Sequence, residues 1–289
     1  MENLVTTKWL ADELGKPDLV VFDASMYLPT EPQDAQALYR AQHIPGARFF
    51  DINEFADPDA SLPHMVPGAA RFERLMGAQG VGHATRVVFY DQRGLFSAAR
   101  GWWLMRLFGH EQVAVLDGGL PKWLREQRAV ASGEAVPLQP AVFTARLRAS
   151  LLRGLGDVLD NVTTPRELLL DARSRGRFEG TAPEPRAGLA SGHVPGSRSL
   201  PFNELLNADG TLLPVEQLQA RFAALGVEQS TAVVASCGSG VTSTVIALAL
   251  AVAGYPPAAI YDGSWSEWGA APGVPVASGP ASDDTALAV

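Results

Sequence analysis

The chain has 289 residues, 47% of them apolar and 19% charged, which is enough for about two domains with ample cores. Its 23 basic and 31 acidic residues give a formal charge of −8, which argues against a nucleic-acid partner because such proteins need a basic surface. Cys237 is the single cysteine. The sequence therefore excludes an internal disulfide and a zinc or iron–sulfur site held by cysteines.

The first residues contain Glu2, Lys8, Asp12 and Glu13 and lack the apolar core of a signal peptide. The longest apolar run, Val245–Ala253, is far shorter than the about 20 residues that a membrane helix needs. We therefore expect a cytoplasmic protein with no membrane association. We also expect no cofactor and no metal.

Each half of the chain alternates short apolar runs with a helical stretch. Taken in chain order, we expect strands at 19–22, 87–90 and 113–116 with a helix at 97–108, then strands at 168–170, 232–236 and 259–261 with a helix at 242–253. Runs that are apolar throughout are typical of strands buried on both faces of a parallel sheet. The sequence predicts an α/β fold in which helices flank a mostly parallel sheet in each half.

Four motifs occur twice, in the same order and roughly 150 residues apart. They are HIPGA (43–47) and HVPGS (193–197), VVFDA (20–24) and LLLDA (168–172), VVFYD (87–91) and VVASC (233–237), and LDGGLPKW (116–123) and YDGSWSEW (261–268). This pattern predicts a duplicated domain. We expect a first domain at 1–131, a linker at 132–150, a second domain at 151–276 and a polar tail at 277–289.

Cys237 lies at the carboxyl end of an expected strand, just before an expected helix. The intervening loop consists of Gly238, Ser239, Gly240, Val241 and Thr242. A strand, a glycine-containing loop and a helix N-terminus bind anions, because loop N–H groups converge and the helix dipole favours negative charge. A cysteine placed there is expected to have a lowered pKa and to act as a nucleophile. A buried, inert cysteine is the alternative that stays open.

Two comparisons narrow the chemistry of this loop. Cysteine phosphatases need an arginine six residues after the nucleophile, and here that residue is Ser243. The position that matches Cys237 in the first copy is Asp91, and a carboxylate cannot perform thiol chemistry. We therefore expect the first domain to be a non-catalytic copy.

Together these motifs resemble the two-domain rhodanese-type sulfurtransferases, over about residues 3–275. The repeated H-[IV]-P-G motif, the six-residue loop and the DGG or DGS segment near the end of each copy carry the resemblance. The loop CGSGVT (237–242) resembles that of 3-mercaptopyruvate sulfurtransferases, whereas thiosulfate sulfurtransferases usually have two basic residues there. The resemblance implies two rhodanese-like domains and a persulfide on Cys237. Sulfur would pass from 3-mercaptopyruvate to a thiol, thioredoxin or cyanide, with release of pyruvate.

The segment GRFEGTAPEPRAG (176–188) resembles the substrate-binding segment of that family. The resemblance implies that Arg177 and Arg186 hold the carboxylate and carbonyl groups of the substrate, a planar pattern that suits guanidinium groups. From their spacing alone, the arginines of this region fit solvated surface charges equally well. For Arg173 we expect a structural role beside Asp171.

Some family members are proposed to move protons through a serine, a histidine and an acid. Ser239 and His64 match the first two, and the acid position falls on Asn53, which cannot act as an acid. Without such a relay, Ser239 is a hydrogen-bond donor and His64 a loop residue. Two other functions stay open, namely a thiosulfate sulfurtransferase and a persulfide carrier without enzymatic activity.

Overall fold

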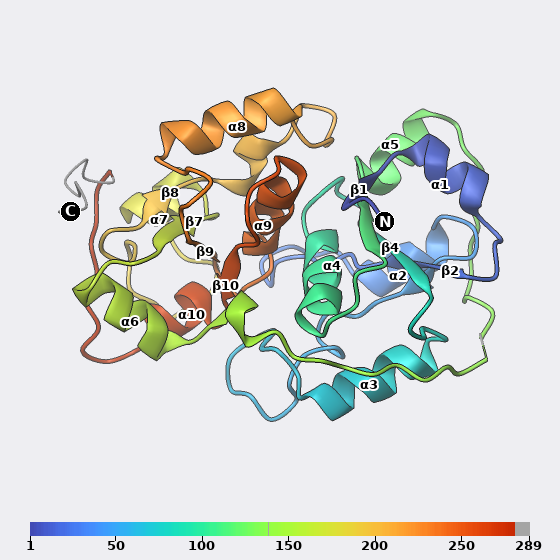
Figure 1. Cartoon of the computed structure of the whole chain (residues 1–289), viewed down its shortest axis with the longest axis horizontal. Helices are drawn as coiled ribbons and strands as arrows, with labels where there is room; N and C mark the ends of the chain where they lie inside the picture. Colours follow the sequence, from blue (N-terminus) through green and yellow to red (C-terminus); the bar gives the residue numbers. More distant parts are fainter. Residues whose placement is uncertain (138, 281–289) are drawn as a thin grey trace. The chain divides into compact units, whose positions relative to one another are not determined.

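The computed structural model describes residues 1–137 and 139–280, which form two compact units (Figure 1). Unit 1 contains Met1–Asp59, Val66–Arg148 and Leu206–Leu212. Unit 2 contains Ala60–Met65, Ala149–Leu205 and the described residues from Leu213 onward. Each unit thus includes one short segment from the other half of the sequence. The domain limits expected at residues 131 and 151 stay a prediction, and the last nine residues of the predicted tail lie outside the described residues.

Unit 1 has a five-stranded sheet in the order β1-β5-β4-β2-β3, and every neighbouring pair is parallel. Its strands are β1 (Leu4–Val5), β2 (Leu19–Asp23), β3 (Arg48–Phe49), β4 (Arg86–Tyr90) and β5 (Val113–Leu116). Its helices are α1 (Thr7–Glu13), α2 (Ala35–Ala41), α3 (Ala69–Ala78), α4 (Ala98–Leu107) and α5 (Gly119–Arg125).

Unit 2 repeats this topology, with a parallel sheet in the order β6-β10-β9-β7-β8. Its strands are β6 (Leu152–Arg153), β7 (Leu168–Asp171), β8 (Arg198–Ser199), β9 (Val233–Ser236) and β10 (Ala259–Tyr261). Its helices are α6 (Leu155–Thr163), α7 (Arg175–Glu179), α8 (Val215–Ala224), α9 (Ser243–Val252) and α10 (Ser264–Trp268), with 3-10 turns η1 (Ala149–Leu151) and η2 (Phe202–Leu205). The predicted fold class and the duplication are confirmed.

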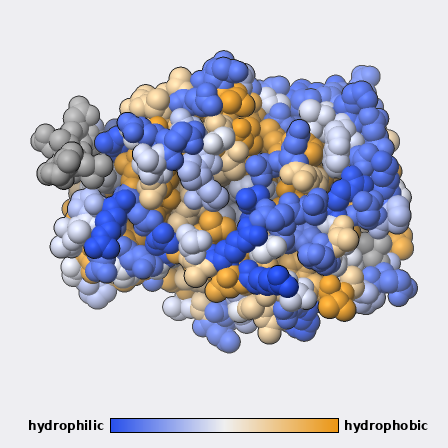
Figure 2. All heavy atoms as spheres, in the orientation of Figure 1, coloured by the Kyte–Doolittle hydropathy of each residue, from blue (hydrophilic) through white to orange (hydrophobic). Residues whose placement is uncertain are grey.

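The core of each unit lies around its central strands. All four residues of β5 and all four of β9 are buried, as a strand covered on both faces requires. Helix α9 is buried along Ser243–Leu250, which explains why it is apolar on most of its faces. Hydrophilic side chains dominate the face drawn in Figure 2, where apolar side chains form small groups among them. Among the described residues, we find no helix that is long and apolar enough to span a membrane.

The histidines of the repeated H-[IV]-P-G motif are structural. His43 Nδ1 lies 2.8 Å from the carbonyl oxygen of Tyr39, and His193 Nδ1 lies 2.8 Å from that of Phe178. Each imidazole also stacks on the ring of the same partner, with centroids 4.3 Å and 3.7 Å apart. Both copies of the motif therefore use a buried histidine to satisfy a backbone carbonyl group.

Candidate active site

The loop after β9 is held from one side by the start of α10. The carbonyl oxygen of Cys237 accepts a hydrogen bond from the N–H of Trp265 at 3.0 Å. The carbonyl oxygen of Gly238 accepts from the N–H of Ser266 at 2.8 Å and from its hydroxyl at 2.6 Å. Because these carbonyl groups are occupied by α10, the loop can direct N–H groups toward the sulfur of Cys237.

Two glycines of this loop are required for different reasons. Gly240 has φ +74°, a left-handed conformation that glycine adopts without strain. At Gly238 the constraint is space, since a Cβ atom there would lie 3.0 Å from Nη2 of Arg177. Glycine thus lets the loop turn at one position and lets a guanidinium group approach the backbone at the other.

The sulfur environment of Cys237 stabilises a thiolate. The residue is 2% exposed, and burial by itself would raise the pKa of its thiol. Hydrogen bonds from the hydroxyl groups of Thr242 and Ser243, and from the N–H groups of Ser243 and Ser239, outweigh burial, so the pKa is lowered.

Arg177 and Arg186 both reach the loop beside Cys237. Measured from the place where a side chain on Gly238 would begin, Nη2 of Arg177 lies 3.0 Å away and Nη1 of Arg186 lies 3.9 Å away. Burial lowers the pKa of Arg186; the charge on Cys237 opposes this, and the charge of Arg177 adds to it. The structure therefore brings together, within unit 2, Cys237 and the two arginines that the sequence singled out.

Glu184 orients Arg177. Glu184 was not among the residues singled out from the sequence. Its buried carboxylate accepts hydrogen bonds from Nη2 of Arg177 at 2.6 Å and from Nη1 of Arg173 at 2.8 Å. Arg173 also binds Asp171 at 2.7 Å and lies over the ring of Trp265. Its expected structural role is confirmed. An acid within a short arginine-rich segment was the one available signal for Glu184.

His64 and Ser239 are 175 residues apart in sequence and form a hydrogen bond. The Nδ1 atom of His64 lies 2.9 Å from Oγ of Ser239, and both side chains are buried. His64 has φ +62°, which is uncommon for a residue other than glycine and marks a locally constrained backbone. The segment Ala60–Met65, which carries His64, belongs to unit 2. The two residues are therefore placed where a proton can pass between them.

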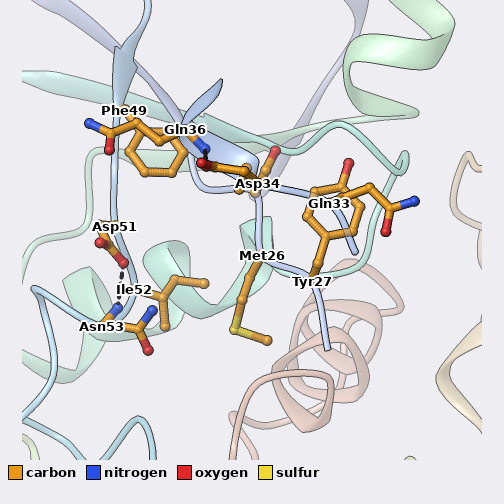
Figure 3. Close-up of a pocket in the computed structure, with 11 residues that line it drawn as sticks. Met26, Tyr27, Gln33, Asp34, Gln36, Phe49, Asp51, Ile52 and Asn53 are labelled. Carbon is orange, nitrogen blue, oxygen red and sulfur yellow. Dashed lines mark hydrogen bonds between the residues drawn. The ribbon is translucent and has the colours of Figure 1, made fainter. Parts of the chain in front are cut away.

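Asn53, the residue at the expected acid position, lies in unit 1. It lines a polar pocket of about 280 Å³ at the carboxyl ends of β2 and β3 (Figure 3). Its backbone N–H donates a hydrogen bond of 2.9 Å to the carboxylate of Asp51. Asp34 and Tyr27 are among the other polar residues of this pocket. Over the part of the chain that the structure describes, no group of three His, Cys, Asp or Glu side chains could hold a metal ion.

A family model, the rhodanese-like domain, matches this chain twice, at residues 6–126 and 155–271. The chain belongs to the rhodanese-like family. The resemblance inferred from the repeated motifs and the loop is thereby confirmed.

The named relatives of this chain are sulfurtransferases of two kinds. The chain is 43% identical over 271 residues to the 3-mercaptopyruvate sulfurtransferase of Rattus norvegicus, covering 92% of this chain and 91% of the relative. It is 46% identical over 272 residues to the thiosulfate sulfurtransferase of the same organism, with the same coverage. The crystal structure of SseA from Escherichia coli, described as a 3-mercaptopyruvate sulfotransferase, has a TM-score of 0.82 and 37% identity, covering 92% of this chain and all of that one. Both kinds of sulfurtransferase are similar to this chain to nearly the same degree.

Proposed function

We propose that this chain is a sulfurtransferase that takes sulfur from 3-mercaptopyruvate and carries it as a persulfide on Cys237. One observation carries the proposal, namely that Arg177 and Arg186 converge on Gly238, the residue next to the nucleophile. Two guanidinium groups beside a thiolate match a substrate that carries a carboxylate and a ketone next to its sulfur. A passive persulfide carrier has no need of such a pair.

The loop chemistry supports 3-mercaptopyruvate over thiosulfate as the donor. Thiosulfate is a small dianion, and cations within the loop itself would help to bind it. Gly238, Ser239 and Gly240 provide only N–H groups and one hydroxyl. Arg177 and Arg186 supply the positive charge instead. Their two planar guanidinium groups can bind two separate oxygen-bearing groups of one substrate.

The first half-reaction transfers sulfur to the enzyme. The Cys237 thiolate attacks the sulfur of 3-mercaptopyruvate, an S–S bond forms, and the C–S bond breaks. The electron pair of that bond passes to the carbon, which leaves as pyruvate enolate, held by Arg177 and Arg186. Ser239 and His64 supply the proton that turns the enolate into pyruvate. Because Asn53 cannot be an acid, we assign no third member to this relay.

The second half-reaction removes the outer sulfur. The N–H groups of Ser239 and Ser243 and the hydroxyl of Thr242, which lower the pKa of the Cys237 thiol, also stabilise negative charge on the persulfide. A thiol, thioredoxin or cyanide attacks the outer sulfur, and Cys237 leaves as a thiolate, ready for another turnover. These acceptors follow from the family resemblance. A cytoplasmic site of action stays a prediction.

Thiosulfate is the second candidate donor, favoured by the 46% identity to a thiosulfate sulfurtransferase. A kinetic comparison with cyanide as the common acceptor separates the two. We expect kcat/KM for 3-mercaptopyruvate to exceed that for thiosulfate. If thiosulfate were the better donor by tenfold or more, the assignment of the donor would be wrong while sulfur transfer itself would stand.

A further inference from the structure

A second cavity in unit 2, of about 620 Å³, lies at the amino ends of β7 and β9. This is the sheet edge opposite the catalytic loop, since Cys237 follows the carboxyl end of β9. The residues that line the cavity include the apolar residues Val162, Pro165 and Leu169 and the basic residues Arg166 and Arg198. Its size is within the range of pockets that hold small organic ligands.

The repeat explains why this space is open in unit 2. The sequences AQGVGHATRVV (78–88) and ALGVEQSTAVV (224–234) match, so Ala232 takes the position that Arg86 has in unit 1. Likewise PDLVVFDA (17–24) matches PRELLLDA (165–172), so Arg166 takes the position of Asp18. In unit 1 the Arg86 side chain binds Asp18 at 2.7 Å. Unit 2 has neither residue of this ion pair, and an alanine stands where unit 1 has the large side chain.

Unit 2 also has a basic residue, Arg166, at the cavity where unit 1 has the acid Asp18. Neither Arg166 nor Arg198 forms an ion pair with any carboxylate in the described part of the chain, and Arg198 donates from Nη1 to the carbonyl oxygen of Leu225. Two acids line the cavity. Glu167 is held on both oxygens by Arg153, at 2.9 Å and 2.6 Å, whereas Glu228 is exposed. The residues that line the cavity therefore include two arginines without a carboxylate partner and one exposed acid.

Unit 1 shows how the arginine at the position of Arg198 can be used. Its counterpart there is Arg48, in the matching segments HIPGARF (43–49) and HVPGSRS (193–199). Arg48 donates from Nε to the side-chain oxygen of Gln79 at 2.6 Å and from Nη1 to the carbonyl oxygen of Val136 at 2.8 Å. Both acceptors, in Gln79 and Val136, lie outside β3 and the loop before it. A guanidinium group at this position thus binds oxygen acceptors brought to it from outside its own strand and loop.

We propose that this cavity is a second ligand site, which binds a small organic anion with a carboxylate or sulfonate group on an apolar body. The acidic group pairs with Arg166 and Arg198, and the apolar body packs on Val162, Pro165 and Leu169. Charge and surface of the cavity are complementary to such a ligand. The site is separate from the arginines beside Cys237, because it lies at the opposite ends of the same strands.

The test is a fluorescence titration of the full chain with 8-anilinonaphthalene-1-sulfonate, an aromatic sulfonate. Saturable binding is expected. Ala232→Arg, which restores the residue that unit 1 has at this position, should weaken binding tenfold or more. Arg166→Gln should weaken it several-fold, and Arg74→Gln, which removes an exposed arginine from α3, should leave it unchanged. Circular dichroism and thermal unfolding check that each variant is folded.

The catalytic arginines provide the remaining control, since they too can attract a sulfonate. Arg186→Gly should leave the fluorescence titration unchanged. The proposal is overturned if the probe does not bind saturably, or if Arg186→Gly abolishes binding while Ala232→Arg and Arg166→Gln leave it intact. Because none of these readouts depends on sulfur transfer, a failure here is distinct from a failure of the proposed enzymatic function.

Discussion

Asp91 in unit 1 and Cys237 in unit 2 follow matching strands and begin matching loops. Both oxygens of Asp91 are held at 2.8 to 2.9 Å by the backbone N–H groups of Arg93, Phe96, Ser97 and Ala98. Cys237 uses the matching N–H groups of Ser239 and Ser243. The comparison teaches that the loop and helix N-terminus form an anion cradle in both units. Unit 1 places the carboxylate of Asp91 in the cradle, and unit 2 places the sulfur of Cys237 there.

A second difference lies at the carboxyl ends of β2 and β7. Asp171 in unit 2 is paired with Arg173, which leads through Glu184 to Arg177. In unit 1 the matching aspartate, Asp23, has Ser25 where unit 2 has the arginine, and its carboxylate accepts hydrogen bonds from Ser25 and Gln92. Unit 2 thus has a chain of alternating charges that ends at Arg177, beside the loop of Cys237, whereas no cation pairs with Asp23 among the described residues of unit 1.

We expect the largest effects from replacing Cys237 or Asp91, the two side chains that the matching loops surround. Cys237→Ser should abolish sulfur transfer, because a serine hydroxyl cannot hold a persulfide. Asp91→Asn should leave kcat/KM within a factor of about two but lower the free energy of unfolding by about 1–3 kcal/mol, since the amide cannot accept four N–H donors. Turnover assays and chemical denaturation measure the two outcomes. Loss of activity in Asp91→Asn without loss of stability would contradict the view that unit 1 is non-catalytic.

Replacing either arginine beside Gly238 should weaken the use of 3-mercaptopyruvate. Arg177→Gly or Arg186→Gly should lower kcat/KM by about 100-fold, mainly through a higher KM, because a charged hydrogen-bonded pair is lost. Arg175→Gly is the matched control, since Arg175 lies in the same segment but is exposed and paired with Glu204. Unchanged kinetics in the first two variants would remove the argument for the substrate.

Glu184→Gln should affect binding through Arg177. We expect KM for 3-mercaptopyruvate to rise about tenfold with a smaller change in kcat, because Arg177 loses the carboxylate that orients it. The free energy of unfolding should fall by about 2–3 kcal/mol, since Arg173 is buried and loses a partner. Glu179→Gln, in the same segment, should change neither quantity. Equal loss of kcat in all variants of this segment would instead indicate general disruption.

Asp23 should make the stability of the protein depend on pH. Burial raises the pKa of Asp23 to about 6, so the folded state holds this proton more tightly than the unfolded state. The contribution of Asp23 to stability is therefore greatest below about pH 4 and declines as the pH rises to about 6, by about 2–3 kcal/mol. Asp23→Asn should remove that decline in a series of denaturation curves. Asp171→Asn should instead destabilise the protein, because Arg173 is left buried without its partner.

We expect the smallest effect from a substitution in the loop and helix N-terminus that surround the Cys237 sulfur. Ser243→Ala removes one hydroxyl that helps to lower the pKa of the Cys237 thiol, so this pKa should rise. Alkylation by iodoacetamide, followed against pH, reports this value directly. A shift to lower pH would mean that Ser243 does not stabilise the thiolate.

Much of the fold could be predicted because buried parallel strands are visible as apolar runs. The limits of β5 and β10 matched the expectation, and helix α9 began and ended within one residue of it. The edge strands β1, β3, β6 and β8 have two residues each, too few for any pattern to show. Cys237 could be found from the strand, loop and helix around it, because that signal is local.

The contacts that complete the site could not be predicted in the same way. The pairing of His64 with Ser239 joins residues 175 positions apart, and nothing in the sequence near residue 64 indicates that Ala60–Met65 belongs with unit 2. Glu184 escaped notice because a single acid in a polar loop is usually solvated. Its importance follows from burial between two arginines, which depends on how the chain folds back.

The central claim is that Cys237 carries the sulfur. Intact-protein mass spectrometry after mixing the chain with 3-mercaptopyruvate tests it most directly, with peptide mapping to locate the change. We expect a gain of one sulfur atom, about 32 Da, on Cys237. The gain should be absent in Cys237→Ser and should be reversed by cyanide. No gain in mass on the unaltered chain, while pyruvate is still released, would contradict it.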